Sequence, residues 1–249
     1  MVTKGFLFLV AGVLFALAFI SSCASDDVED GSIEYGGQTY KIIVINGQQL
    51  LSQNLNYDVP GSKCYDNNSA NCNRYGRLYN WVMAMALPPS CVSLSCIDKI
   101  GTPHRGICPN GWHIPTNAEW DKLYRFADGD NGTNSPYDSP TAGRYLKAKA
   151  GWNHCGPYSS PSSSGSSSSS GSDESYLCDD TLGFTALPGG YYNSIGFYEV
   201  GEYGHWWSAS ENEKDVSKAY KRYIFHRNDK AYWGYGIKNY FFSLRCFKD

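Results

Sequence analysis

The sequence predicts an α+β domain in which a hairpin and two helices precede a strand-rich C-terminal half. Aromatic residues make up 15% of the chain and charged residues 18%, a balance typical of a β-rich domain with an aromatic core. Two segments between residues 77 and 129 have helical spacing, whereas residues 184–249 contain short aromatic runs separated by turns. Because helices and strands are segregated along the chain, an α+β arrangement is favoured.

Residues 1–22 have the pattern of an export signal and are not expected to join the fold. Lys4 supplies a positive charge, and the run from Gly5 to Ile20 is apolar. This run is shorter than the roughly 20 residues that a membrane-spanning helix needs. It ends at Ile20-Ser21-Ser22-Cys23, which resembles a lipobox, where the cysteine is diacylated after cleavage. An ordinary signal peptide followed by a structural cysteine is the alternative.

The cysteine content favours lipidation of Cys23. The chain has 9 cysteines, so removal of Cys23 leaves an even number, as a disulfide framework in an exported protein requires. No apolar span follows Cys23, so attachment to a membrane would depend on the acyl chains. The remaining cysteines are Cys64, Cys72, Cys91, Cys96, Cys108, Cys155, Cys178 and Cys246.

Residues 23–35 are expected to form an acylated acidic tether. Acidic residues are concentrated between Asp26 and Asp30, and Ala24 at the second mature position is compatible with outer-membrane sorting. The acidic cluster is similar to the surface-export signals of some Gram-negative lipoproteins, and it is equally consistent with a solvated spacer. We therefore expect an outer-membrane lipoprotein, and exposure on the cell surface is a hypothesis.

Residues 40–54 are expected to form the first hairpin. The β-branched run Lys41–Ile45 precedes Asn46-Gly47, the strongest two-residue hairpin signal. The first helix is expected over Arg77–Leu87, where apolar residues recur at helical spacing before Pro88-Pro89.

The second helix is expected to begin after Thr116 and to end by Asp128-Gly129. Thr116 is a natural N-cap, and Glu119 three residues later completes a capping box. This structural role explains Glu119 without any catalytic function. Three tryptophans are expected in the core: Trp81, Trp112 and Trp120.

The remaining segments are loops and strands. Residues 128–141 are polar, and residues 159–172 are almost entirely Ser and Gly, so we expect the latter to be an insertion in a loop. A turn at Arg227–Lys230 would join two of the expected strands. These strands are Phe184–Leu187, His205–Ser210, Ala219–His226, Ala231–Ile237 and Tyr240–Lys248.

Several motifs then carry a family resemblance. They are Gly37–Lys41, Gln53–Tyr57, Cys64-Tyr65 with Cys72, Tyr75–Trp81, Gly106–Thr116, Ala186–Gly190, Trp206–Ser210 and Leu244–Asp249. In this order they resemble the Fibrobacter succinogenes major paralogous domain, a family found mainly in exported bacterial lipoproteins. The resemblance covers residues 36–249, which we expect to form a single domain. It implies no catalytic residues, because no catalytic role is established for the family.

A second resemblance concerns the fold. The helix opening at Ile114-Pro115-Thr116 and the late Trp206-Trp207-Ser208 are similar to the C-type lectin-like fold and to the formylglycine-generating-enzyme group that shares it. The resemblance implies a C-type lectin-like domain of two helices packed on short, twisted antiparallel strands with long loops. It also implies a bridge from Cys108 to Cys246. Proximity then suggests the pairs Cys64–Cys72, Cys91–Cys96 and Cys155–Cys178.

Metal, cofactor and nucleic-acid sites are not expected. The formal net charge is −3, which argues against nucleic-acid binding. No two of the 5 histidines have a metal-binding spacing, and the acidic loop after Asp128 lacks the register of a calcium loop. The sequence also lacks a Gly-x-Ser-x-Gly elbow and a phosphate loop.

The candidate ligand-binding residues are aromatic and polar side chains of the C-terminal half. In lectin-like folds the long loops before the terminal strands form the ligand face. Aromatic rings there could stack on sugars or anchor a partner protein, and the alternative is that they fill a small core. The candidates are Tyr191, Tyr192, Tyr198, Tyr203, His205, Tyr232, Trp233 and Tyr235.

Three functions stay open at this point. The first is a non-catalytic envelope module that binds polysaccharide or a partner protein. The second is an enzyme of the formylglycine-generating lineage, which would need free thiols. The third is a purely structural envelope component. Because eight cysteines are expected to pair, we favour the first.

Overall fold

The computed structural model of the protein describes residues 1, 31–129, 138–155 and 177–249. The expected signal peptide, the lipidation site Cys23, most of the tether and the Ser/Gly insertion at 159–172 lie outside these residues. Among the helices in the described ranges, none has the length and apolar character needed to cross a membrane.

A five-stranded antiparallel sheet contains both ends of the domain. In spatial order its strands are β1 (Ser32–Tyr35), β2 (Gln38–Ile45), β3 (Gln48–Leu51), β13 (Phe247–Lys248) and β5 (Trp112–His113). The β2–β3 hairpin is the expected one, because Asn46 (φ 51°) and Gly47 (φ 73°) both have the positive φ of a type I′ turn. Strand β1 pairs with β2, so the sheet begins at Ser32, within the segment expected to form the tether.

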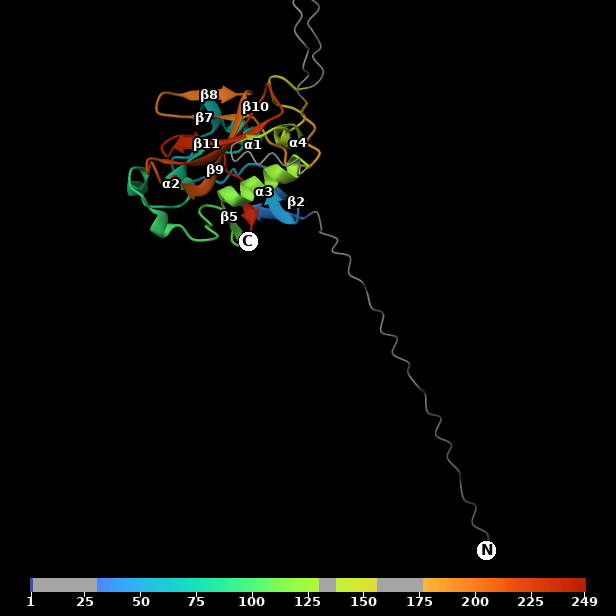
Figure 1. The fold of residues 1–249 in the computed structure, drawn as a ribbon. Coiled ribbons are helices and arrows are strands. Elements are labelled where there is room, and N and C mark those ends of the chain that lie inside the picture. The colour runs from blue at the N-terminus through green and yellow to red at the C-terminus, as the bar shows by residue number, and fades with distance from the viewer. Residues whose placement is uncertain (2–30, 130–137, 156–176) are drawn as a thin grey trace, which may run out of the picture.

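A four-stranded antiparallel sheet crosses the middle of the molecule (Figure 1). Its order is β6 (Asp138–Ser139), β11 (Ala231–Ile237), β10 (Lys218–Phe225) and β9 (Tyr203–Glu211). Directly opposed residues of antiparallel strands point to the same face. Tyr223 opposes His205 of β9, whereas Arg222 opposes Trp206, so these two pairs lie on opposite faces of the sheet.

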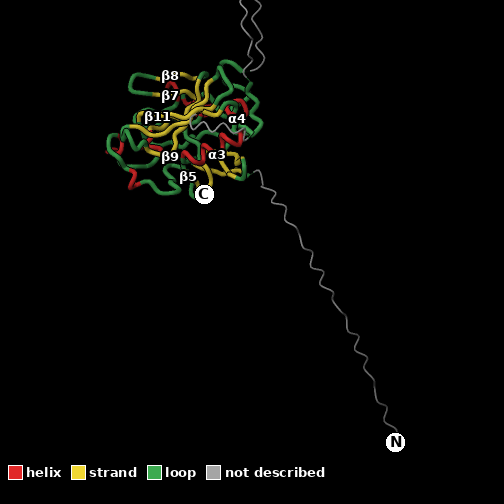
Figure 2. The backbone as a smooth tube through the Cα atoms, viewed as in Figure 1, coloured by secondary structure: helices red, strands yellow, loops and turns green. Residues whose placement is uncertain are grey.

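A third sheet includes a hairpin that the sequence analysis did not anticipate. Its order is β4 (Tyr79–Asn80), β12 (Phe241–Phe242), β7 (Gly189–Tyr192) and β8 (Phe197–Val200). Figure 2 shows β7 and β8 on the opposite side of the molecule from β5 and the C-terminus. The strand expected at Phe184–Leu187 is absent apart from one bridge at Ala186, and the strand expected over Tyr240–Lys248 is divided into β12 and β13.

The helices are short. They are α1 (Ser69–Tyr75), α2 (Trp81–Ala84), α3 (Asn117–Ala127) and α4 (Ala142–Leu146), with 3-10 turns at Tyr65–Asn67, Pro89–Val92 and Ile97–Lys99. The capping box that opens α3 is confirmed, with Glu119 bonded to the Thr116 backbone. The expected helix at Arg77–Leu87 was wrong in extent, because residues 79 and 80 pair with β12 and the Asn80 side chain caps α2 instead.

Two aromatic clusters form the core, and α3 lies between the middle sheet and the five-stranded sheet (Figure 1). Trp120 of α3 packs against Trp206 of β9 and Phe247 of β13, with ring centroids 6.4 and 5.5 Å apart. The second cluster surrounds Trp81 and Trp207. The expected burial of Trp81, Trp112 and Trp120 is therefore confirmed.

All cysteines in the described residues form disulfide bonds. The bridges are Cys64–Cys72, Cys91–Cys96, Cys108–Cys246 and Cys155–Cys178, which are the pairs implied by the resemblance and by proximity. The Cys108–Cys246 bridge joins residues 138 positions apart and ties the segment before α3 to the last strand. The domain is thus a mixed structure of short strands and few helices, cross-linked at four places.

A buried arginine connects the segments that meet at the centre. Arg245 is fully buried and donates hydrogen bonds to the carbonyl oxygens of Leu51 and Phe184 at 3.0 and 2.6 Å. It also donates to Asn54 Oδ1 at 2.8 Å, which accepts a second bond from Trp206 Nε1 at 2.7 Å. We call Arg245, Asn54 and Trp206 the arginine hub.

Replacement of the hub arginine tests its structural role. Arg245→Met keeps much of the side-chain volume but leaves buried carbonyl oxygens without a donor. We expect the free energy of unfolding to fall by roughly 3 kcal/mol, measured by urea titration with the disulfides intact. Arg227→Met, at an exposed arginine, is the control and should change it by less than about 0.5 kcal/mol. Equal effects of the two substitutions would contradict the role of the hub.

Candidate functional site

A small cavity of about 230 Å³ lies between the β7–β8 hairpin and the outer face of β9 and β10. It is large enough for one sugar ring or a fragment of similar size, and smaller than the roughly 300–1,000 Å³ of pockets for larger ligands. We call it the tyrosine pocket. Its lining residues are Tyr191, Glu199, Tyr203, His205, Lys221, Tyr223, Tyr240 and Phe242.

A chain of hydrogen bonds crosses the pocket. Glu199 Oε2 lies 2.9 Å from His205 Nε2, and Lys221 Nζ lies 3.3 Å from His205 Nδ1. Because a lysine can only donate at pH 7, Nδ1 must accept, and the ring proton is therefore assigned to Nε2, which donates to Glu199. The imidazole is thus neutral and connects an ammonium group to a carboxylate.

The surroundings disfavour charge at each of these groups. Burial lowers the pKa of His205 well below its usual value, and the positive charge of Lys221 lowers it further. Burial also lowers the pKa of Lys221 to about 8, against an opposing effect of Glu199. The pKa of Glu199 is raised by burial, and Lys221 partly offsets this. Lys221 therefore titrates close to neutral pH.

Local backbone geometry brings Glu199 to the pocket. Glu199 has a φ of 66°, in the left-handed region that few residues other than glycine adopt. Gly190 across the hairpin also has positive φ, and a Cβ there would lie 2.2 Å from the Tyr198 carbonyl oxygen. Glycine is required for this close approach of β7 and β8. The glycine at position 190 thus has a steric explanation.

Aromatic rings form the walls. Tyr191 stacks on Tyr240 with centroids 5.8 Å apart and planes 10° from parallel. Tyr203 stacks on Phe225 at 4.5 Å, and its ring is also parallel to that of His205. The Lys221 ammonium lies 4.9 Å from the centroid of the Phe242 ring. Tyr191 and Tyr203 are both partly exposed, and such amphipathic rings can offer a hydroxyl group as well as an apolar face to a ligand.

The structure brings only some of the expected ligand-binding residues together. Tyr191, Tyr203 and His205 line the pocket, and Tyr198 stacks on Tyr191 at 5.4 Å. Tyr198 and the other four predicted residues do not line it. Tyr192 packs on Phe197 and Phe241, Tyr232 stacks on Tyr223, and Trp233 and Tyr235 cluster with Tyr220.

The position of Trp233 and Tyr235 follows from strand register. They oppose Arg222 and Tyr220, so they lie on the face of β10 and β11 away from Lys221. Glu199 and Lys221 were not among the residues predicted from the sequence. Lys221 and Tyr223 are two residues apart in a strand, so their side chains share one face, and this spacing could have indicated that Lys221 lies on the same face as His205. No sequence pattern indicated the contact between β8 and β9.

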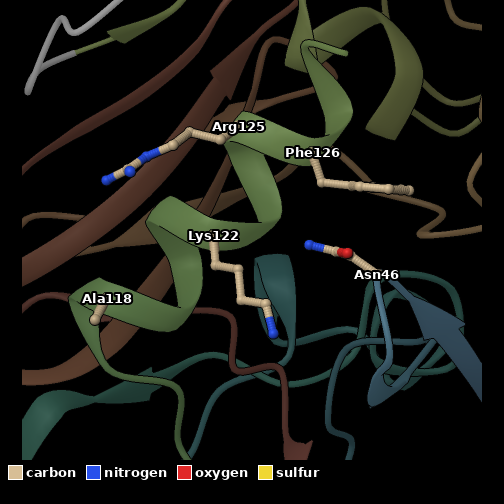
Figure 3. Close-up of a pocket in the computed structure, with 5 residues that line it drawn as sticks. All are labelled: Asn46, Ala118, Lys122, Arg125 and Phe126. Carbon is tan, nitrogen blue, oxygen red and sulfur yellow. The ribbon is translucent and has the colours of Figure 1, made fainter. Parts of the chain in front are cut away.

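A larger hollow of about 300 Å³ lies beside α3 (Figure 3). Asn46 of the hairpin turn faces Phe126 and Lys122 of the helix, while Arg125 extends away from the turn. The side chains around it are mostly exposed, and no buried polar group of the described chain is among its lining residues. It therefore offers less specific chemistry than the tyrosine pocket.

The remaining histidines do not form a metal centre. His154 and His226 meet through their Nδ1 atoms at 2.8 Å, and His113 bonds to Glu119 and to Asp249. Within residues 31–129, 138–155 and 177–249, no group of three or more His, Cys, Asp and Glu side chains is arranged to hold a metal ion.

A family model, the Fibrobacter succinogenes major domain, matches residues 34–248. The chain belongs to this family. No curated protein and no solved structure matches the chain. The shared motifs now have structural explanations: Asn54 and Arg245 form the arginine hub, and Gly190 permits the β7–β8 contact. Glu199, His205 and Lys221 lie outside the motifs that carried the resemblance.

The titration of Lys221 gives a prediction for stability. Its pKa is lowered to about 8 in the folded protein from 10.5, so between these values the unfolded state binds more protons. The free energy of unfolding of the native protein should therefore rise, relative to Lys221→Met, as pH increases from 8 to 10.5. Urea titrations of both proteins at several pH values measure this difference. A difference that is independent of pH would contradict the lowered pKa.

Proposed function

We propose that this protein is a lipid-anchored, non-catalytic envelope module that binds a small saccharide unit in the tyrosine pocket. One observation carries the proposal: an open pocket whose walls are tyrosine rings and whose base contains Lys221, His205 and Glu199. Sugar rings pack their apolar faces on aromatic side chains, and their hydroxyl groups exchange hydrogen bonds with charged and amide groups. The pocket offers both kinds of contact within the space of one ring.

The position of the pocket supports display from a membrane anchor. The described domain begins at Gly31, whose carbonyl accepts a hydrogen bond from the Ile42 amide of β2. The β7–β8 hairpin lies on another side of the molecule, away from β2 (Figure 1). A tether of 8 residues from Cys23 to Gly31 would reach at most about 28 Å. A domain held that close to a bilayer would present the pocket away from it.

We also propose kinship with the C-type lectin-like fold. The Cys108–Cys246 bridge to the last strand and the capped helix α3 support it. The enzyme alternative has less support, because the described cysteines are all in disulfides and supply no thiol pair.

Loss of a stacking ring should weaken saccharide binding. Tyr203→Ala removes a wall of the pocket, and we expect retention on immobilised glycans (cellulose, xylan and cell-wall glycans) to fall by about tenfold. Tyr235→Ala is the matched control, because Tyr235 lies on the opposite face of the sheet, and it should leave retention unchanged. If no glycan retains the native protein, or if both variants lose retention equally, saccharide binding in this pocket is wrong.

Lipid anchoring makes a separate prediction. Cys23→Ser removes the acylated sulfur, so the protein should move from the membrane fraction to the soluble fraction of the producing cell. Intact mass should show acyl chains on the native N-terminus and none on the variant. Protease treatment of intact cells then tests orientation: digestion of the domain supports surface display, and complete protection refutes it.

A further inference from the structure

We propose that Lys221 is a nucleophilic lysine that condenses with the carbonyl group of a small aldehyde, such as the open-chain end of a reducing saccharide. The inference deepens the proposed function and rests on it for the saccharide, but the lysine chemistry can be tested with an aldehyde that is not a sugar. Nothing else in the tyrosine pocket is a comparable nucleophile.

Lys221 lies at the cavity beside His205, which is in turn oriented by Glu199. Lys221 lines the cavity, and His205 is the hydrogen-bond partner that the described residues provide for its Nζ. A nucleophile next to a base that is oriented by a third group is a common arrangement for activation. Here His205 is the base, and Glu199 fixes its tautomer and orientation at 2.9 Å. Glu199 is a positioning residue in this scheme, whereas His205 relays a proton.

Lys221 is partly buried, whereas Lys147 and Lys238 are fully buried. Lys238 forms an ion pair with Glu211 and donates to the carbonyl oxygen of Cys91 at 2.8 Å. Its ammonium group is therefore bound by structural partners and has no exposed surface. Lys221 has rings of Tyr223 and Phe242 beside it instead, at 5.0 and 4.9 Å. Lys221 is thus partly buried among these rings, and it forms no ion pair with a carboxylate of the described residues.

Burial also affects the protonation of the Lys221 side chain. Burial lowers the pKa of Lys221 to about 8 and that of Lys147 to about 8 as well, but of these two lysines Lys221 is the one that lines the tyrosine pocket. Only the neutral amine attacks a carbonyl carbon, so burial increases the population of the reactive form. Other titratable groups face Lys221 from neighbouring elements: Glu199, His205, Tyr191, Tyr203, Tyr223 and Tyr240.

The step is balanced without an oxidant or a cofactor. The ammonium group first releases a proton to solvent, and the Nζ lone pair then forms a bond to the carbonyl carbon. A second proton moves from the nitrogen to the former carbonyl oxygen, relayed by His205 Nδ1, which gives a carbinolamine. The nitrogen loses its last proton as the hydroxyl group leaves with one proton as water. The products are an imine at Lys221 and one water molecule, and hydrolysis reverses the reaction.

Reductive trapping tests the proposal on the full-length protein in detergent. The protein is incubated with glycolaldehyde and cyanoborohydride at pH 7, and the modification of each lysine is measured by peptide mass spectrometry. Lys214 is the internal control, because it is more exposed than Lys221 and accessibility alone would favour it. We expect Lys221 to be modified at least about tenfold faster than Lys214. Equal or slower modification of Lys221 would overturn the proposal.

Two variants separate activation from simple exposure. Glu199→Gln can still accept from His205 but removes the negative charge that raises the Lys221 pKa, so the pH midpoint of Lys221 modification should shift downward. His205→Gln should reduce the preference for Lys221 over Lys214. An unchanged midpoint and an unchanged preference in folded variants would assign no role to either residue and overturn the proposed activation.

The same experiment distinguishes this inference from the proposed function. Fast trapping of Lys221 by glycolaldehyde, together with no retention on any glycan, would support the nucleophile and refute saccharide binding. Retention on glycans without preferential trapping would support the binding module and refute the nucleophile.

Discussion

The arginine hub is the interaction on which the arrangement of this domain depends. A buried guanidinium group is costly unless it is hydrogen-bonded, and the two Nη atoms of Arg245 find acceptors on Leu51, Phe184 and Asn54. These acceptors belong to segments far apart in the chain, so the hub can form only when the N-terminal hairpin, the segment before β7 and the C-terminus are in place. The neighbouring Cys108–Cys246 bridge closes a loop of 138 positions and, in the loop-entropy description, contributes about 5 kcal/mol.

The hub also determines which side chains reach the tyrosine pocket. Trp206 donates its indole N–H to Asn54 and is held on the inner face of β9. Since side chains alternate along a strand, His205 must then point to the outer face, where it meets Lys221 and Glu199. Residues of the family motifs, such as Asn54, Trp206 and Arg245, therefore hold the strands that carry the site, whereas Glu199, His205 and Lys221 lie outside these motifs. This explains why a clear family membership does not by itself identify a ligand.

Lys238 and Lys221 show how surroundings decide the role of one residue type. Lys238 is neutralised by Glu211 and bound to a backbone carbonyl, so it links the Cys91–Cys96 loop to β9. Lys221 reaches a carboxylate only through the neutral ring of His205, and burial therefore lowers its pKa to about 8. The second arrangement leaves an amine with a lowered pKa at an open cavity.

The sequence by itself determined the local features of this protein. The Asn46-Gly47 turn, the capping box of Thr116 and Glu119, and the even number of cysteines in the expected mature domain depend on near neighbours or on counting, so they could be read directly. The helix expected at Arg77–Leu87 could not be judged in this way, because Tyr79 and Asn80 pair with Phe242 and Phe241, which lie 163 and 161 residues further along the chain. Only the tertiary structure decided which tyrosines share a pocket and that Glu199, His205 and Lys221 meet. Those contacts join β8, β9 and β10 through strand register and a positive φ, which are properties of packing rather than of any local sequence pattern.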